Sequence, residues 1–166
     1  GLLLLTNDGD FANLMMHPSH GVSKLYRVTV RPRAEESQVI ALSKGVQLDD
    51  GAVTQPAVIN VVVDEPGRTV LEMTIKEGKN RQIRRMCEAV GLEVVRLRRS
   101  AVGAVKLGVL QPGQYRPLAK SELVALRAAA QKGKARAVTR EQQERAAQTV
   151  QTRQRTPRRR PARGAK

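Results

Sequence analysis

Apolar and polar residues alternate with two different periods along the first 130 residues of the chain. A period of two predicts strands over residues 24–31, 57–63, 68–75 and 92–100, and a continuous apolar run predicts a buried strand over residues 2–5. Apolar residues three and four positions apart predict helices after Asp8, over 35–43, between Asn80 and Gly91, and over 122–130. Strands and helices are therefore interspersed in one domain.

The same alternation assigns side chains to faces. One face of the strand over 24–31 carries Lys24, Tyr26, Val28 and Val30, and the helix over 35–43 is predicted to turn inward Val39, Ile40 and Leu42. In the strand over 92–100, Val95 and Leu97 alternate with Arg96 and Arg98, and the apolar pattern continues through residues 105–110. Pro66 and Gly67 predict a hairpin, and Asp8 and Asn80 are predicted helix caps.

The pattern ends near residue 131. Residues 131–166 consist mainly of Arg, Gln, Ala and Thr with no aromatic residue, so they cannot form a packed core. Thr139 and Gln142 have the spacing of a capping box and could begin a short helix. The sequence thus predicts a folded domain over 1–130 and a basic, mostly disordered tail over 131–166.

Charge is distributed unevenly between these two parts. The whole chain has a formal charge of +15, but residues 1–126 hold 17 Lys and Arg against 13 Asp and Glu, while residues 127–166 hold 13 against 2. Such a basic segment binds polyanions by neutralising phosphates and releasing counterions. Nucleic acid is the first expected partner and an anionic membrane surface the second. Aromatic residues make up only 2% of the chain, which argues against platforms of stacked bases.

Several kinds of chemistry are disfavoured. Cys87 is the only cysteine, which excludes an internal disulfide, and His17 and His20 lack the partners of a metal site. Ser23 and Ser100 have no His and Asp arrangement typical of a hydrolase. No apolar run is long enough to span a membrane, and no leader is visible. We expect a soluble, cytoplasmic, monomeric protein without a metal or small-molecule cofactor.

The segment over residues 77–86 has the most specific composition. A glycine turn leads into a predicted helix whose first turns hold Arg81, Arg84 and Arg85. Cations at a helix N-terminus oppose the macrodipole, which suggests an anionic partner: either RNA phosphate or a carboxylate elsewhere in the protein. A solvated basic face is the remaining interpretation.

This segment, Glu-Gly-Lys-Asn-Arg-Gln-Ile-Arg-Arg-Met, resembles the signature of the RsuA/RluB type of ribosomal RNA pseudouridine synthases. Residues 1–10, 24–28, 94–99 and 113–118 resemble further blocks of that family, so the resemblance extends to about residue 126. It implies an α+β fold with a mixed, largely antiparallel sheet and peripheral helices. It also implies that a uridine in ribosomal RNA, or in a precursor ribosomal subunit, is isomerised without a cofactor.

The resemblance also implies roles for single residues. Arg84 matches the arginine that pairs with the family's catalytic Asp, and Tyr26 matches a tyrosine that lines the uracil pocket. Without the resemblance, Tyr26 would be interpreted as a strand residue that fills space. The residues expected to hold RNA phosphates are Lys79, Arg81, Arg85, Arg96, Arg98 and Arg99.

The family's catalytic Asp belongs to a Gly-Arg-Leu-Asp block that precedes the segment matched by residues 1–10. Asp8 and Asp10 follow that block, and helix capping accounts for them. We therefore expect this polypeptide alone to bind RNA, with its tail as a non-specific anchor, and to have little or no synthase activity. The alternative is a non-catalytic RNA-binding or ribosome-assembly module.

Overall fold

The computed structural model of the chain describes residues 1–155. Five strands form one sheet in the order β2-β3-β1-β4-β5, and their bounds are Lys24–Arg31 (β1), Val58–Glu65 (β2), Arg68–Ile75 (β3), Glu93–Val102 (β4) and Val105–Lys106 (β5). The α+β class is confirmed. Every pair of strands in the described residues is antiparallel, whereas the sequence predicts a mixed sheet that is largely antiparallel.

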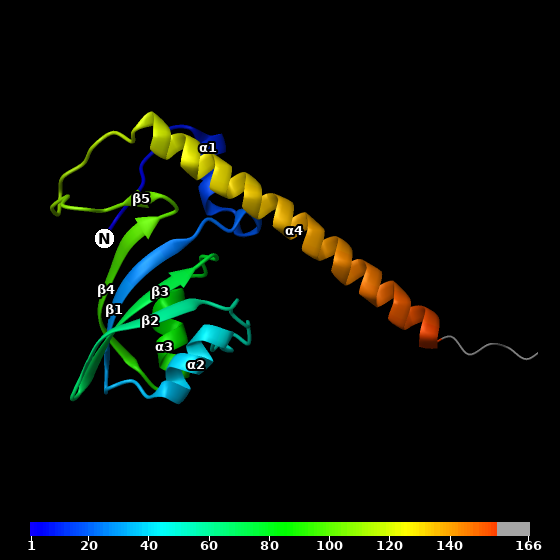
Figure 1. The fold of residues 1–166 in the computed structure, drawn as a ribbon, viewed down its shortest axis with the longest axis horizontal. Helices are drawn as coiled ribbons and strands as arrows, with labels where there is room; N and C mark the ends of the chain where they lie inside the picture. Colours follow the sequence, from blue (N-terminus) through cyan, green and yellow to red (C-terminus); the bar gives the residue numbers. More distant parts are fainter. Residues whose placement is uncertain (156–166) are drawn as a thin grey trace, which may run out of the picture.

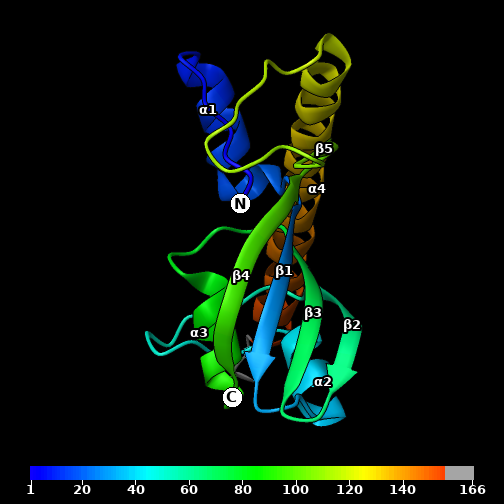
Figure 2. The ribbon, with the colours of Figure 1, turned by 90° about the vertical axis from the view of Figure 1, so that its left-hand side faces the viewer.

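Helices cover one face of this sheet and one of its ends (Figure 1). The bounds are Gly9–Met16 for α1, Glu36–Lys44 for α2, Gln82–Ala89 for α3 and Lys120–Arg155 for α4, with a short 3-10 helix, η1, over Pro18–His20. Figure 2 shows β4, β1, β3 and β2 side by side in front of α2 and α3. No helix of the described residues lies over the face turned toward the viewer.

The main core lies between the sheet and the α2 and α3 helices. Its fully buried side chains include Leu42 of α2, Val28 and Val30 of β1, and Leu71 and Met73 of β3. Burying each of these side chains contributes about 1.5–3 kcal/mol. The predicted inward face of β1 is therefore confirmed, and so is the hairpin of β2 and β3, whose turn has Gly67 at φ 80°.

A second core joins α1 and the first half of α4 to the end of the sheet. Asp8 caps α1 by accepting a hydrogen bond of 2.9 Å from the Phe11 amide, which confirms its predicted role. Phe11 packs with Leu126 and Ala130 of α4. Further along α4, a Cβ on Gly133 would lie 1.7 Å from the carbonyl oxygen of His20, so the helix crosses η1 backbone against backbone. This contact fixes the direction in which α4 leaves the domain.

Several local predictions are wrong. Residues 2–5 form no strand, because Leu2 alone bonds to β4: its amide donates to the Arg99 carbonyl, and its carbonyl accepts a bond from the Arg99 guanidinium. Leu3 is 67% exposed. Ile40 is exposed because α2 turns Leu42 rather than Ile40 to the sheet. Val95 is also exposed, since a register shift in β4 moves it out of the alternation. The apolar pattern after residue 105 supports only two strand residues.

The largest difference concerns the predicted tail. Residues 131–155 continue α4 instead of forming a disordered segment, and Thr139 lies inside the helix with its hydroxyl bonded to the Ala135 carbonyl at 3.1 Å. The segment is rich in Ala, Gln, Arg and Glu, which favour helices without any need for a buried face. Residues 156–166 lie outside the described residues. None of the described helices combines the length and the apolar character that a membrane crossing needs.

Candidate active site

Tyr26 lies beside two cations on the helix-covered face of the sheet. It stands opposite Arg99 of β4 and opposite the fully buried Met73 of β3, so all three side chains share this face. Lys24 precedes Tyr26 by two residues and stands opposite the buried Ile75, which places it on the same face. Tyr26 is half-buried against the main core. An aromatic ring thus shares this face with two cations, one two residues before it in β1 and one opposite it in β4.

Lys24 occupies an unusual environment for a lysine. Its ammonium group donates a 3.2 Å hydrogen bond to the Val22 carbonyl, and a Cβ on Gly78 would lie 3.9 Å from it. Burial lowers the pKa of Lys24, and the nearby Arg99 guanidinium lowers it further. A carboxylate or phosphate placed beside these two cations would relieve their repulsion.

A buried hydrogen-bond network holds the loop between β3 and α3. The Glu77 carboxylate is 6% exposed and accepts bonds from the Gln55 amide at 2.8 Å and from the Gln82 side-chain amide at 2.5 Å. Gln82 in turn accepts a bond of 3.0 Å from the Lys79 amide. Glu77 and Gln82 therefore fix the backbone from which Lys79 and Arg81 project.

The loop presents its two cations differently. The Lys79 ammonium donates to the Val53 carbonyl at 2.9 Å and lies 3.9 Å from the Glu77 carboxylate. Arg81 is exposed and begins α3 with φ at 46°, the one positive φ among the described non-glycine residues. Arg81 is therefore the N-cap of α3, and the prediction that Asn80 is the cap was wrong. A left-handed backbone costs about 1–2 kcal/mol in a residue with a Cβ.

Arg84 lies one turn into α3, on the helix that packs under the Tyr26 face. Its guanidinium donates a 2.9 Å hydrogen bond to the Val94 carbonyl at the start of β4. No salt bridge within the described residues includes Arg84. Ile83 and Met86, which flank it in α3, belong to the core against which Tyr26 packs. Arg84 and Tyr26 thus lie on the same side of the sheet.

Arg85 has carboxylate partners within the domain. It bonds to Asp49 at 2.6 Å through its Nε atom and to Asp50 at 2.7 Å through a terminal nitrogen. The hydrogen bond from Arg85 is the main reason why the pKa of Asp50 lies below its usual range. Arg85 therefore ties α3 to the turn over residues 49–51, and its assignment to RNA phosphates stays a prediction.

The remaining two arginines of the predicted set lie on the other face of the sheet. Arg98 stands opposite Arg27 in β1, and Arg96 stands opposite Thr29. Neighbouring residues of a strand point to opposite faces, so Arg98 and Arg99 are separated by the sheet itself. The structure therefore brings Tyr26, Arg84 and Arg99 to one side, close to the loop of Lys79 and Arg81, and leaves Arg96 and Arg98 on the other.

Three residues that shape this site were not singled out from the sequence. Lys24 could have been found as a charged residue on an otherwise inward-facing set of side chains. Glu77 and Gln82 gave no separate signal, because buried polar partners become visible only when the loop is folded.

Within the described residues, no group of three or more His, Cys, Asp or Glu side chains could hold a metal ion. Cys87 is a buried core residue, and this burial raises the pKa of its thiol to about 12, so it is not a reactive thiolate.

Comparison with known proteins gives a consistent result. The sequence profile of the family described as RNA pseudouridylate synthase matches residues 1–89. The chain is 41% identical over 136 residues to the ribosomal large subunit pseudouridine synthase B of Bacillus subtilis, covering 81% of this chain and 55% of that protein. It is 37% identical over 128 residues to the ribosomal small subunit pseudouridine synthase A of Escherichia coli, covering 76% and 54%.

A solved structure described as a pseudouridylate synthase is also similar. It superposes with a TM-score of 0.68 at 34% sequence identity, over 73% of this chain and 52% of the other. The chain spans about half the length of the curated relatives it matches. By profile, sequence identity and fold, the chain belongs to the RNA pseudouridylate synthase family and, within it, to the RsuA/RluB type.

Proposed function

We propose that the protein converts a uridine in ribosomal RNA to pseudouridine, with the face around Tyr26 as the uracil pocket. The observation that carries this proposal is the half-buried tyrosine beside Lys24 and Arg99, in a chain whose relatives are named as ribosomal pseudouridine synthases. In the reaction, the C1′–N1 bond breaks, the base rotates, and C1′ bonds to C5. The C5 hydrogen is released as a proton and N1 gains one.

The target base has to leave its stack to enter such a pocket. Extruding a base costs a few kcal/mol, which contacts to the base and to the flanking phosphates must offset. Tyr26 supplies a ring on which the flipped uracil stacks, Arg99 lies on the same face, and Lys79 and Arg81 project from the loop whose Gly78 lies beside Lys24. Lys24 adds positive charge at the pocket wall, beside Gly78.

The role assigned to Arg84 is to hold the nucleophilic carboxylate in the orientation from which it attacks. A guanidinium beside an Asp keeps that carboxylate ionised and fixes its direction of attack. No carboxylate of the described residues forms a salt bridge with Arg84, and Asp8, which caps α1, lies 3.5 Å from Arg127. We propose that residues outside these 166 supply the nucleophile, and that this polypeptide alone binds RNA with little or no synthase activity.

The test is tritium release from C5-labelled uridine in precursor ribosomal RNA. This chain is compared with a version extended upstream to include the Gly-Arg-Leu-Asp block. Activity in the extended version alone is expected, and activity in the 166-residue chain would overturn the assignment of the nucleophile. Activity in neither would favour the alternative, a non-catalytic RNA-binding or ribosome-assembly module.

The residue assignments are tested in the active version. Arg84→Ala is expected to lower the rate by about 100-fold or more, because a misplaced reacting group costs rates of that size. Arg68→Ala is the matched control, since Arg68 pairs only with Glu65 at the far hairpin. Equal rates for the two variants would remove Arg84 from the catalytic site. Monomeric state, cytoplasmic location and the lack of a cofactor stay predictions from the sequence.

A further inference from the structure

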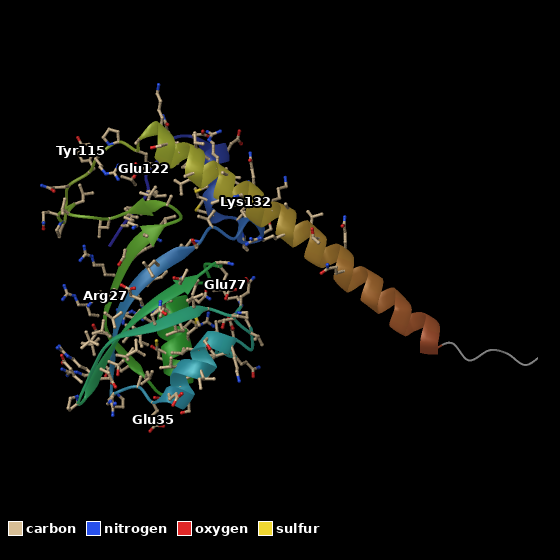
Figure 3. The ribbon with its side chains drawn as sticks, viewed as in Figure 1. Arg27, Glu35, Glu77, Tyr115, Glu122 and Lys132 are labelled. Carbon is tan, nitrogen blue, oxygen red and sulfur yellow. The ribbon has the colours of Figure 1, made fainter. Side chains whose placement is uncertain are left out.

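The uncovered face of the sheet carries a cluster of arginines that the uracil pocket does not use. Arg27 of β1 stands directly opposite Arg98 of β4, and Arg96 lies two residues before Arg98 in the same strand. All three side chains are exposed. Figure 3 shows Arg27 on the side of the sheet away from Glu77 and the α3 loop. We call these three residues the arginine face.

Like charges at directly opposite positions of an antiparallel pair are destabilising. Glu72 of β3 gives partial compensation: it stands opposite Arg27 at 4.0 Å, the limit of a salt bridge, with its side chain 37% exposed. Arg96 and Arg98 form no salt bridge within the described residues. Glu72 is the one carboxylate of the described residues within salt-bridge distance of these three guanidinium groups, so this face has an excess of positive charge.

A groove lies beside the arginine face. It has a volume of about 1020 Å³, and its walls come from the N-terminal segment, from β4 with Arg96 and Arg98, and from the long loop between β5 and α4. Tyr115, on that loop, lines the groove with its side chain 88% exposed (Figure 3). The chain has only two tyrosines: Tyr26 lies at the proposed uracil pocket, and Tyr115 lines this separate groove along β4.

We propose that the arginine face and this groove bind a second part of the same RNA, with the three arginines on its phosphates and Tyr115 stacked on a base. Arg96 and Arg98 are about 6.8 Å apart along the strand, close to the spacing of neighbouring phosphates in a nucleic-acid chain. An exposed aromatic side chain beside cations is the arrangement that binds single-stranded RNA without reading its sequence.

The proposal rests on the proposed function in one respect, namely that RNA is the partner. It adds that the RNA passes around β4. Arg98 and Arg99 are consecutive and point to opposite faces, so an RNA chain that touches both contacts the domain on two sides. Such a path would hold the flanking nucleotides while the target base enters the pocket at Tyr26.

The test measures binding of a labelled single-stranded ribosomal RNA fragment by fluorescence anisotropy at several salt concentrations. The triple variant Arg27→Gln, Arg96→Gln and Arg98→Gln removes three contacts, so the log-log salt slope should fall by about 2. The control triple variant Lys44→Gln, Arg68→Gln and Lys120→Gln loses the same charge from exposed positions elsewhere. Its slope should change by less than about 0.7. Circular dichroism checks that both variants are folded.

Tyr115 is tested separately. Tyr115→Ala should weaken binding by roughly tenfold, while Tyr115→Phe should keep most of the affinity because the ring still stacks. Equal slopes for the two triple variants would overturn the proposal while leaving RNA binding intact. A wild-type chain that fails to bind RNA would overturn the proposed function together with it. Tighter binding of polyglutamate than of RNA, lost in the arginine variant, would assign the face to an acidic polypeptide instead.

Discussion

The three arginines at the start of α3 are in three different environments, although their spacing in the sequence makes them look alike. Arg85 pairs with Asp49 and Asp50, Arg84 bonds to a backbone carbonyl, and Arg81 is exposed. An anionic partner within the protein therefore accounts for Arg85. For the other two, the proposed function supplies the partner: RNA for Arg81 and a catalytic carboxylate for Arg84.

Glu77 is the residue whose change would affect the candidate site most without touching a bound RNA. Glu77→Ala would leave the Gln55 amide and the buried Gln82 side chain without their acceptor. Each buried unsatisfied group costs about 1–3 kcal/mol, so we expect a loss of roughly 2–4 kcal/mol in the free energy of unfolding. Urea denaturation measures this loss directly.

The matched variant is Glu77→Gln, which keeps one acceptor oxygen and nearly the same shape. It is expected to lose less than half as much stability as Glu77→Ala. Equal stability of Glu77→Ala and the wild type would show that the network does not hold the loop. The exchange rate of the Lys79 amide, measured by NMR, should rise in Glu77→Ala, because Gln82 would no longer be fixed to accept its hydrogen bond.

At the scale of single residues, periodicity predicted more than local cap preferences did. The faces of Tyr26, Val28 and Val30 follow from the pleat of a strand and are confirmed. Asn80 was predicted as a cap from its type, but the chain turns one residue later, at Arg81. The buried hydrogen bonds of Glu77 and Gln82 hold that turn, and cap preferences by residue type do not predict such bonds.

At the scale of elements, α4 has a conflict between helix propensity and packing at Gly133. Glycine within a helix costs about 1 kcal/mol relative to alanine, so propensity alone predicts that Gly133→Ala is stabilising. The added Cβ would instead lie 1.7 Å from the His20 carbonyl, which belongs to backbone and cannot rotate away. Overpacking costs about 1–3 kcal/mol. We expect a net loss of stability and a melting temperature lower by several degrees.

Gly9→Ala is the matched control for that experiment. Gly9 is also helical, at the first position of α1, and nothing lies within 4 Å of a Cβ placed there. Thermal unfolding of the two variants should therefore show a loss only for Gly133→Ala. A gain of stability in both variants would mean that α4 does not cross η1 at this distance.

Most of the elements that the sequence predicted well have a buried face. β1, β3, α2 and α3 each place apolar residues at the period of their own structure and bury some of them, whereas β2 buries none and was found from its apolar run beside the Pro66-Gly67 turn. Residues 131–155 have no such face, so a criterion based on burial predicted disorder. A helix needs only local hydrogen bonds and favourable propensities, which this segment has, and α4 therefore continues.

At the scale of the whole molecule, the sequence predicted the family from blocks of residues but not the arrangement of the cations in space. The alternation of Arg96, Arg98 and Arg99 already implied that they cannot all face one pocket, yet only the register with β1 shows which of them accompanies Tyr26. Positive charge is therefore present on both faces of the sheet and again along α4. In the proposals above, one RNA contacts all three regions together.

The contribution of α4 can be separated from that of the domain by a truncation after Ala137, because its described contacts with α1 and η1 involve earlier residues such as Leu126, Ala130 and Gly133. Residues 138–166 hold nine Lys and Arg and two Glu, so removal lowers the net charge from +15 to +8. If this segment makes about five phosphate contacts with single-stranded RNA, the log-log salt slope should become shallower by about 3.5, while the melting temperature of the domain stays the same. A full-length variant with these nine basic residues replaced by Gln should match the truncation, since charge rather than helix length drives counterion release. An unchanged salt slope in both variants would show that the segment is not an RNA anchor.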